Sequence, residues 1–153
     1  MNIGILGGGQ LGRMLALAGY PLGLRFRFFD PAPDAPAQHL GQRIVGNYAD
    51  NDALDRFADG LDLVTYEFEN VPVSAARRVA ERVPVYPPPA ALESAQDRLA
   101  EKTFFQQLNI PTPPFLQVDS VTDLAAAVNR VGLPAVLKTR RLGYDGKGQY
   151  VIQ

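Results

Sequence analysis

The sequence contains no cysteine, a single histidine and no apolar run of membrane-spanning length. Without cysteine the chain has no disulfide, no thiolate nucleophile and no cysteine metal site, and this composition fits a reducing cytoplasm. The one histidine, His39, has no partner that the sequence identifies, and a lone histidine is more often a surface or packing residue than a ligand. The strand pattern that begins at Met1 leaves no room for a signal peptide. We therefore expect a cytoplasmic protein that does not enter a membrane.

Net charge is also small, at −1 over 153 residues. No overall field would draw this chain to nucleic acid or to a membrane surface, so any anion site has to be local. The length allows one ordinary domain, or a small domain together with part of a second. The sequence has no internal repeat and no low-complexity segment.

The first motif is a strand, a glycine turn and a helix in direct succession. Residues 2–6 predict a buried parallel strand, and Gly7–Gly12 reads G-x-G-x-x-G before a helix from Arg13. A helix N-terminus of this kind offers unpaired N–H groups to an anion. The strand at 24–29 ends at Asp30, where an acid would hold the ribose in an NAD enzyme. Two hypotheses stay open: a nicotinamide-dependent oxidoreductase, or another doubly wound fold that binds no dinucleotide.

Strands and helices continue to alternate as far as residue 89. After Asp30 we expect a turn that runs into a short helix by Ala37, and we expect Asp50 to cap a later helix. The remaining elements are predicted as strands at 43–45, 61–66 and 83–86 and helices at 50–57 and 73–83. This alternation predicts an α/β, doubly wound, Rossmann-like domain over residues 1–89, with a parallel sheet and helices on both faces.

Two acids, Glu67 and Glu69, follow the strand at 61–66. Residues just past the carboxyl end of a parallel strand face the ligand crevice of a doubly wound sheet. Because Phe68 separates the two acids, both carboxylates can point the same way. A solvated acidic loop is the alternative interpretation of the same residues.

Residues 90–153 predict the beginning of a second domain. Ser94–Asp97 has the form of a capping box and predicts a helix that runs to Leu108. Arg98 in the first turn opposes the helix dipole, which indicates an outside partner, although an ordinary exposed arginine is the commoner case. Ser120–Asp123 is a second capping box, and its helix is predicted to end at Gly132.

The segment richest in functional groups is Lys138–Gln149, which lies between an apolar strand at 134–137 and a second strand at 150–152. Three glycines within residues 143–148 allow the backbone to approach a ligand, and successive N–H groups in such a turn form an anion site. The cations around it suit phosphate: Lys138, Arg140, Arg141 and Lys147. A basic hairpin on a solvated edge is the alternative. Two strands alone would leave unpaired edges, so the second domain looks cut short.

Five segments, taken together, resemble the start of N5-carboxyaminoimidazole ribonucleotide synthetase, the purine-biosynthesis member of the ATP-grasp superfamily. They are GGGQLGRM at 7–14, DPAPDAPA at 30–37, TYEFENVP at 65–72, DRL at 97–99 ahead of Lys102, and KTRRLGYDGKGQ at 138–149. The first is weak evidence alone, whereas the last, following TYEFENVP, is highly specific. The resemblance covers the whole chain. It implies a Rossmann-like pre-ATP-grasp domain at 1–89 followed by the first, lid part of an ATP-grasp domain at 90–153.

The resemblance implies ATP- and bicarbonate-dependent carboxylation of 5-aminoimidazole ribonucleotide through carboxyphosphate. It assigns ATP contacts to Arg98, Lys138, Gly143, Tyr144, Asp145, Gly146, Lys147, Gly148 and Gln149. It assigns the nucleotide substrate to Gln10, Leu11, Glu67, Tyr144, Asp145 and Lys147, and we prefer Glu67 to Glu69. It implies catalytic roles for Lys138, Asp145 and Lys147.

The Mg²⁺ ligands and the adenine pocket are expected in later segments of the family, so residues 1–153 are expected to hold no metal and to be an inactive N-terminal fragment. The full-length form is expected to be a homodimer that acts on small molecules. One alternative is the formate-dependent glycinamide ribonucleotide transformylase of the same superfamily. The alternative from another class is a nicotinamide-dependent oxidoreductase or a bare nucleotide-binding module. We expect the loop at 141–149 to be mobile until ATP arrives, because its cations repel one another.

Overall fold

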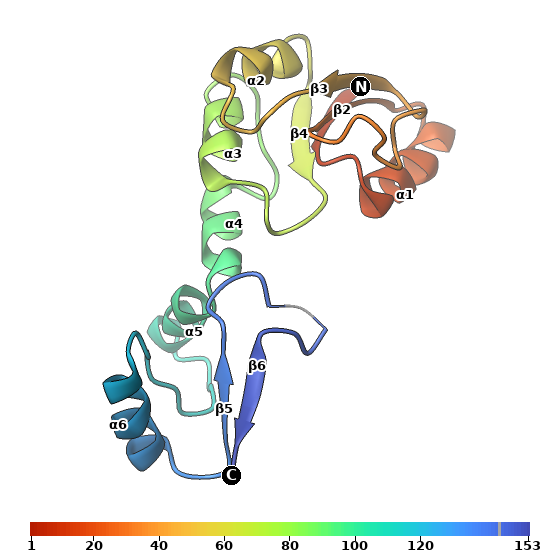
Figure 1. The fold of residues 1–153 in the computed structure, drawn as a ribbon. Helices are drawn as coiled ribbons and strands as arrows, with labels where there is room; N and C mark the ends of the chain where they lie inside the picture. The colour runs from red at the N-terminus through yellow and green to blue at the C-terminus, as the bar shows by residue number, and fades with distance from the viewer. Residues whose placement is uncertain (144) are drawn as a thin grey trace. The chain divides into compact units, whose positions relative to one another are not determined.

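The computed structural model describes residues 1–143 and 145–153 (Figure 1). The chain divides into two compact units, Met1–Glu93 and Ser94–Gln153. The division falls within helix α4 (Pro89–Gln96), whose first residue is the one at which the sequence analysis ends the first domain.

A parallel sheet of four strands forms the centre of the first unit. β1 (Asn2–Leu6), β2 (Arg25–Asp30), β3 (Gln42–Val45) and β4 (Leu63–Tyr66) lie in the order β3-β2-β1-β4. All three pairings are parallel, so the predicted parallel sheet is confirmed. The carboxyl ends of β1 and β4 meet where Leu6 is paired with Tyr66. The residues that follow these two strands are therefore brought together at one edge of the sheet.

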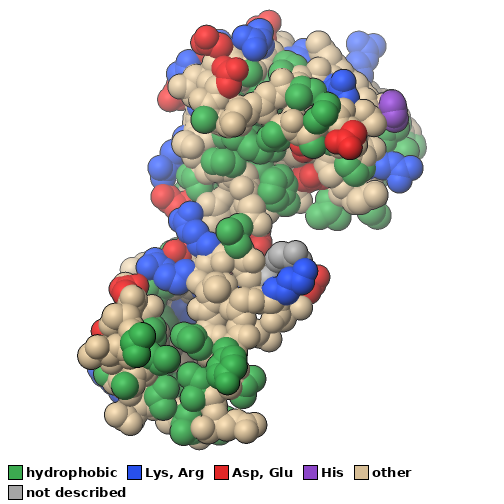
Figure 2. Space-filling model, viewed as in Figure 1, with side chains coloured by type: hydrophobic (Ala, Val, Ile, Leu, Met, Phe, Trp, Pro, Cys, Tyr) green, Lys and Arg blue, Asp and Glu red, His purple; other side chains and the backbone are tan. Residues whose placement is uncertain are grey.

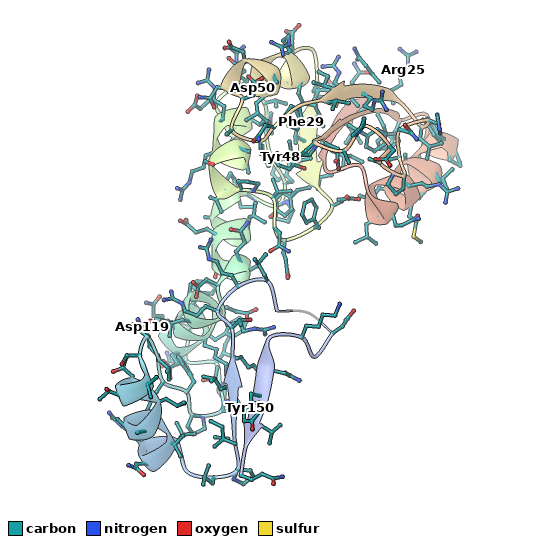
Figure 3. The ribbon with its side chains drawn as sticks, in the orientation of Figure 1. Arg25, Phe29, Tyr48, Asp50, Asp119 and Tyr150 are labelled. Carbon is teal, nitrogen blue, oxygen red and sulfur yellow. The ribbon has the colours of Figure 1, made fainter. Side chains whose placement is uncertain are left out.

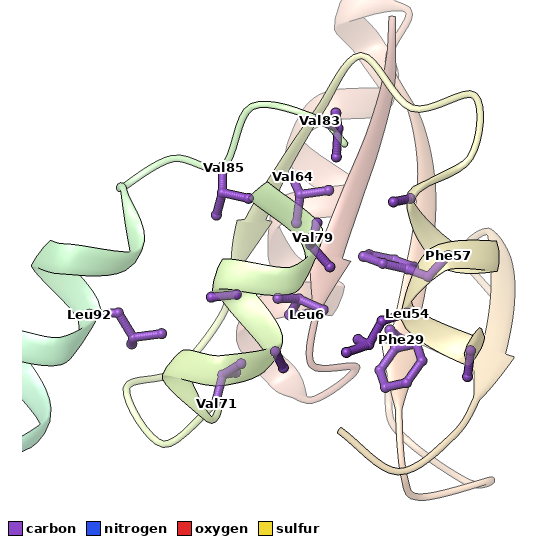
Figure 4. Packing of buried hydrophobic residues seen from close by; sticks show 14 residues of the cluster. Leu6, Phe29, Leu54, Phe57, Val64, Val71, Val79, Val83, Val85 and Leu92 are labelled. Atoms are coloured by element: carbon purple, nitrogen blue, oxygen red, sulfur yellow. The ribbon is translucent and has the colours of Figure 1, made fainter. Parts of the chain in front are cut away.

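The helices cover both faces of this sheet. On one face Ile5 and Phe28 are buried with Ala16 of α1 (Gln10–Gly19). On the other, Leu6 and Phe29 are buried against α2 (Asn51–Ala58) and α3 (Val73–Ala80), and Figure 4 shows this cluster. Successive strand side chains point to opposite faces, so adjacent residues enter different layers. The short 3₁₀ helix η1 (Tyr20–Leu22) follows α1.

Two local predictions for the first unit were wrong. The strand expected at 83–86 is a single parallel bridge between Val64 and Val85. Pro84 has no N–H to donate, so only Tyr86 N–H and Val64 N–H take part, each 2.8 Å from its acceptor. The short helix expected by Ala37 is a series of turns. Three prolines in this segment lack helical donors, and the Ala37 N–H instead donates to Gly8 O at 2.7 Å.

The helix caps follow the predictions at two of three places. Asp50 caps α2, and its Oδ1 accepts from Ala53 N at 3.0 Å (Figure 3 labels Asp50). Ser120 caps α6 (Val121–Val131), and its Oγ accepts from Asp123 N at 3.1 Å. Ser94, predicted to open a helix, instead lies inside α4, so that prediction was wrong. Two helices stand where one was expected, and Asp97, with extended backbone, caps the second of them.

The second unit combines two helices with an antiparallel hairpin. α5 (Arg98–Gln107) and α6 precede β5 (Ala135–Lys138) and β6 (Gln149–Ile152). The two strands pair from Ala135 with Ile152 to Lys138 with Gln149. Much apolar surface remains exposed on this unit, and Figure 2 shows such side chains over α6 and the hairpin. Over the described residues, no helix has both the length and the apolar character needed to cross a bilayer.

The packing of the first unit predicts how stability responds to truncation of its leucines. Leu54 of α2 is 1% exposed, whereas Leu22 is 76% exposed. We expect Leu54→Ala to cost about 2–5 kcal/mol, because the vacated space is enclosed by other core side chains. Leu22→Ala makes the same chemical change at the surface and is expected to stay within about 0.5 kcal/mol. Denaturant unfolding of the 153-residue chain measures both, and equal effects would contradict this description of the core.

Candidate functional site

The carboxylate of Glu67 lies in the glycine turn between β1 and α1. Oε1 accepts from Gly9 N at 2.6 Å and Oε2 accepts from Gly12 N at 2.5 Å. The N-cap residue of α1 is Gly9, which has no side chain to cap the helix itself. Glu67, which follows β4, therefore supplies the negative charge that the N-terminus of α1 favours.

The three glycines of the G-x-G-x-x-G motif make room for this carboxylate. A Cβ atom on Gly7 would lie 2.5 Å from Glu67 Cγ, and one on Gly9 would lie 2.5 Å from Oε1. A Cβ atom on Gly12 would lie 2.9 Å from Oε2. Gly7 also has φ of +103°, which side chains disfavour. The motif in this chain thus surrounds one of its own side chains.

Asp30 pairs with a third N–H group of the turn, that of Gly8. Its Oδ2 accepts from Gly8 N at 2.7 Å and its Oδ1 accepts from Ala32 N at 2.7 Å. The N–H groups of Gly8, Gly9 and Gly12 therefore all have carboxylate partners. The expectation of unpaired N–H groups therefore fails at Gly8, Gly9 and Gly12, and the oxidoreductase hypothesis loses its ribose acid, because Asp30 bonds to the turn itself.

Tyr48 lies near the carboxylates of Asp30 and Glu67, and the sequence analysis did not identify it. Its ring packs on Phe29 with centroids 5.4 Å apart, and its hydroxyl lies 3.5 Å from Phe29 O (Figure 3 labels both residues). Burial raises the pKa of Tyr48 strongly, and the nearby charges of Asp30 and Glu67 raise it further. The phenol therefore keeps its proton at neutral pH. No sequence signal marks it, because it lies in an irregular segment between β3 and α2.

The other predicted site residues of the first unit lie at the surface. Gln10 and Leu11 begin α1, and Leu11 is 57% exposed. Glu69 is exposed, as is Phe68 beside it. Of the two acids, the one placed against the glycine turn is thus Glu67.

In the second unit, Lys138 stands where β5 ends and the glycine-rich loop begins. It pairs with Gln149, the first residue of β6, and Thr139 N donates to Gly148 O at 2.7 Å to close the base of the loop. Gly146 and Gly148 have φ of 78° and 68°. A Cβ atom on Gly148 would overlap the Thr139 side chain, so the hairpin requires glycine there for two reasons.

Arg98 has the outside partner that its position in the helix indicates. Its backbone N–H donates to Arg140 O at 2.9 Å, and its Nη2 donates to Gly143 O at 2.7 Å. Arg98 and Lys138 line the same cavity of about 540 Å³ within the second unit, together with Lys102 and Arg140. The structure thus brings the two residues assigned to ATP phosphates to one cavity.

Asp97, the N-cap residue of α5, pairs with two arginines at the start of the loop, Arg140 and Arg141. Arg140 Nη2 is 2.8 Å from Oδ2, and Arg141 Nε is 3.6 Å from the same atom. Burial alone would raise the pKa of Asp97, but hydrogen bonds from Arg140 and from the N–H groups of Ala100 and Leu99 outweigh it and hold the pKa below its ordinary value. The pair is therefore formed at neutral pH, and its contribution is lost only as the pH falls through that lowered pKa.

This pairing corrects the premise that the loop cations only repel one another, because Asp97 offsets part of the charge of Arg140 and Arg141. Asp145 and Lys147 are exposed in the loop, and Asp145 has φ of 48°. Tyr144, which the sequence analysis assigns to ATP and substrate, lies outside the described residues. Among the described residues, no group of three His, Cys, Asp or Glu side chains is placed to hold a metal ion.

Comparisons with known proteins match both units. The family model "Ribonucleotide synthetase preATP-grasp domain" matches residues 1–96, and the model "ATP-grasp domain" matches residues 103–153. The N5-carboxyaminoimidazole ribonucleotide synthase of Pseudomonas aeruginosa is 57% identical over 153 residues, which are 100% of this chain and 42% of that protein.

Solved structures agree with this similarity. The N5-carboxyaminoimidazole ribonucleotide synthetase from Thermus thermophilus superposes with a TM-score of 0.90 at 65% identity, covering 99% of this chain and 40% of that one. The synthase from Aspergillus clavatus, in complex with ADP and 5-aminoimidazole ribonucleotide, gives a TM-score of 0.84 at 28% identity, covering 98% and 40%. The chain therefore spans about two fifths of the length of these relatives.

The two hydrogen bonds to Glu67 predict that Glu67→Gln destabilises the first unit. An amide offers one acceptor oxygen where the turn uses two, so either Gly9 N–H or Gly12 N–H loses its partner. An unsatisfied buried donor costs about 1–3 kcal/mol. The control is Glu69→Gln at the exposed acid two residues on, which is expected to stay within about 0.5 kcal/mol. Denaturant unfolding compares the two variants, and indistinguishable midpoints would show that Glu67 does not hold the turn.

Proposed function

Because this chain belongs to the ribonucleotide synthetase preATP-grasp family through residues 1–96 and continues as an ATP-grasp domain from residue 103, we propose that the full-length protein is an ATP-dependent carbon–nitrogen ligase. Its substrate is 5-aminoimidazole ribonucleotide, and its product is N5-carboxyaminoimidazole ribonucleotide of purine biosynthesis. This proposal is supported by the similarity of the whole chain to enzymes of that name.

The proposed reaction has two steps. A bicarbonate oxygen attacks the γ-phosphorus of ATP, ADP leaves, and carboxyphosphate forms. The exocyclic amine of the substrate then attacks the carboxyl carbon, inorganic phosphate leaves with the electrons of the broken C–O bond, and the amine loses a proton. Phosphoryl transfer depends on positioning and charge neutralisation rather than on covalent protein chemistry. Carboxyphosphate hydrolyses readily, so exclusion of water by a closing loop is part of the proposal.

The observation that carries this function is the convergence of Arg98 and Lys138 on one cavity beside the glycine-rich loop. We assign the ATP phosphates to these two cations and to the loop Gly143–Gln149. Lys138 and Lys147 would neutralise charge that develops on the transferred phosphoryl group. Gly146 and Gly148, which both have positive φ, let backbone N–H groups approach the phosphates.

We assign the nucleotide substrate to the residues that the resemblance names for it: Gln10, Leu11, Glu67, Tyr144, Asp145 and Lys147. Glu67 is held in one orientation by the turn, which suits a residue that has to present a carboxylate edge to a ligand. Asp145 is the loop acid available to accept a hydrogen bond from the reacting amine. Catalytic roles are thus proposed for Lys138, Asp145 and Lys147.

Mg²⁺ is proposed as the cofactor of the full-length protein, with its ligands outside residues 1–153, where the resemblance places them. For the same reason we expect no turnover from residues 1–153 alone. We propose a homodimer for the full-length protein and a location in the cytoplasm. Formate-dependent transformylation is the alternative within the superfamily, and replacing bicarbonate by formate in the assay distinguishes the two.

The role of Lys138 predicts a loss of ATP use on truncation of its side chain. Loss of a charge-assisted hydrogen bond of about 1.5–3 kcal/mol corresponds to a fall in kcat/KM for ATP of about 10- to 100-fold in Lys138→Ala. The control is Arg130→Ala, which removes an equal charge from the exposed last turn of α6. Steady-state kinetics of the full-length protein measure both. Kinetics of Lys138→Ala that match the control would refute the assignment.

The role of Glu67 predicts a selective effect on the nucleotide substrate. We expect Glu67→Gln to raise KM for 5-aminoimidazole ribonucleotide more than KM for ATP, by about tenfold for the loss of one charged contact of about 1.4 kcal/mol. Glu69→Gln is the matched control. An equal rise in both Michaelis constants, or no rise in either, would count against a substrate role, even if the stability prediction for the same variant holds.

A further inference from the structure

Asp97 is a buried charge that the proposed reaction does not use. Among the described residues it is the one charged residue that is buried, with 7% of its surface exposed. Burying a carboxylate is costly unless its oxygens are paired, so a residue of this kind indicates a specific set of partners.

The two carboxylate oxygens of Asp97 connect two parts of the chain. Oδ1 accepts from Leu99 N at 2.9 Å and from Ala100 N at 3.3 Å, which caps α5. Arg140 reaches both oxygens, with Nε 3.2 Å from Oδ1 and Nη2 2.8 Å from Oδ2. Such a fork of two parallel contacts fixes the orientation of the guanidinium as well as its position.

Arg140 is in turn connected to Arg98 by a backbone hydrogen bond. Arg140 O accepts from Arg98 N, and the Arg98 guanidinium donates to Gly143 O. Asp97 and Arg98 therefore hold both ends of the segment 140–143, where the loop leaves β5. We propose that Asp97 is a positioning residue of the nucleotide loop, whose ion pair with Arg140 keeps Arg98 and the loop root in the arrangement that receives phosphate.

This role differs from simple helix capping. Asp50 caps α2 through one hydrogen bond from Ala53, whereas Asp97 adds an ion pair with a residue 43 positions away. Without that pair, the ordering of the loop root has to be completed when the nucleotide binds, at a cost of about 1–2 kcal/mol for each residue fixed. Removal of the ion pair is therefore expected to weaken nucleotide binding and to leave the rate of the chemical step unchanged.

The test uses Asp97→Asn, because asparagine retains an oxygen that caps the helix but removes the charge that holds Arg140. The Arg98 amide is in the first turn of α5, where no intrahelical acceptor exists, so its protection from exchange reports its bond to Arg140 O. Amide exchange at single-residue resolution on the nucleotide-free, full-length protein is expected to be about tenfold faster at Arg98, with Leu99 and Ala100 little changed.

Two further variants control this measurement. Asp50→Asn makes the same substitution at the cap of α2 and should leave the Arg98 amide unchanged. Arg140→Gln removes the same ion pair from the other side while leaving the Asp97 cap, and it should accelerate exchange at Arg98 as Asp97→Asn does. An Arg98 amide that stays protected in both loop variants would overturn the proposal. Equal acceleration at Leu99 and Ala100 would also overturn it, because Asp97 would then be only a helix cap.

The kinetic part of this inference rests on the proposed function. In the full-length enzyme, Asp97→Asn should raise KM for ATP by about tenfold with kcat within about twofold, as expected when ordering cost is added to binding. In the Arg140→Gln background the same substitution should add little, because the two residues act as one pair. Additive effects would overturn the proposal. If the wild-type protein shows no ATP turnover, the proposed function fails, and the exchange measurement still decides the role of Asp97.

Discussion

The interaction on which the first unit depends is the pair of hydrogen bonds from Gly9 and Gly12 to the carboxylate of Glu67. It joins the residue after β4 to the N-terminus of α1, at the edge where parallel strands end. Two of the N–H groups that would attract an anion to that helix are therefore paired within the protein itself. The N–H groups of Gly9 and Gly12 are then not free for the phosphates of ATP, for which the cavity of the second unit supplies Arg98, Lys138 and Arg140.

In the second unit, too, a carboxylate accepts hydrogen bonds at the N-terminus of a helix. Asp97 places a carboxylate at the N-terminus of α5, as Glu67 does at α1. Each carboxylate also bonds to a residue that is distant in the sequence. Glu67 bonds to a residue 58 positions away and Asp97 to one 43 positions away. In the first unit the partner is the backbone of the turn between β1 and α1. In the second it is an arginine at the root of a glycine-rich loop, so the helix also determines where the loop begins.

The sequence predicted those parts of the fold that depend on residues adjacent in the chain. The strand–turn–helix at residues 2–18, the cap at Asp50 and the strand end at Lys138 follow from adjacent residues. The partners of Glu67 and the burial of Tyr48 did not follow, because they depend on tertiary contacts that no spacing reports. The predicted cap at Ser94 was wrong because Ser94 lies inside α4, and Asp97 caps the helix that follows. The predicted strand at 83–86 was wrong because Pro84 has no N–H to donate.

The most direct test of this account is a crystal structure of the full-length protein with a non-hydrolysable ATP analogue and 5-aminoimidazole ribonucleotide. The account predicts that Glu67 keeps its bonds to the N–H groups of Gly9 and Gly12 while the triphosphate lies against Arg98, Lys138 and the loop Gly143–Gln149. A phosphate group seated in the Gly7–Gly12 turn, with the Glu67 carboxylate displaced, would contradict it.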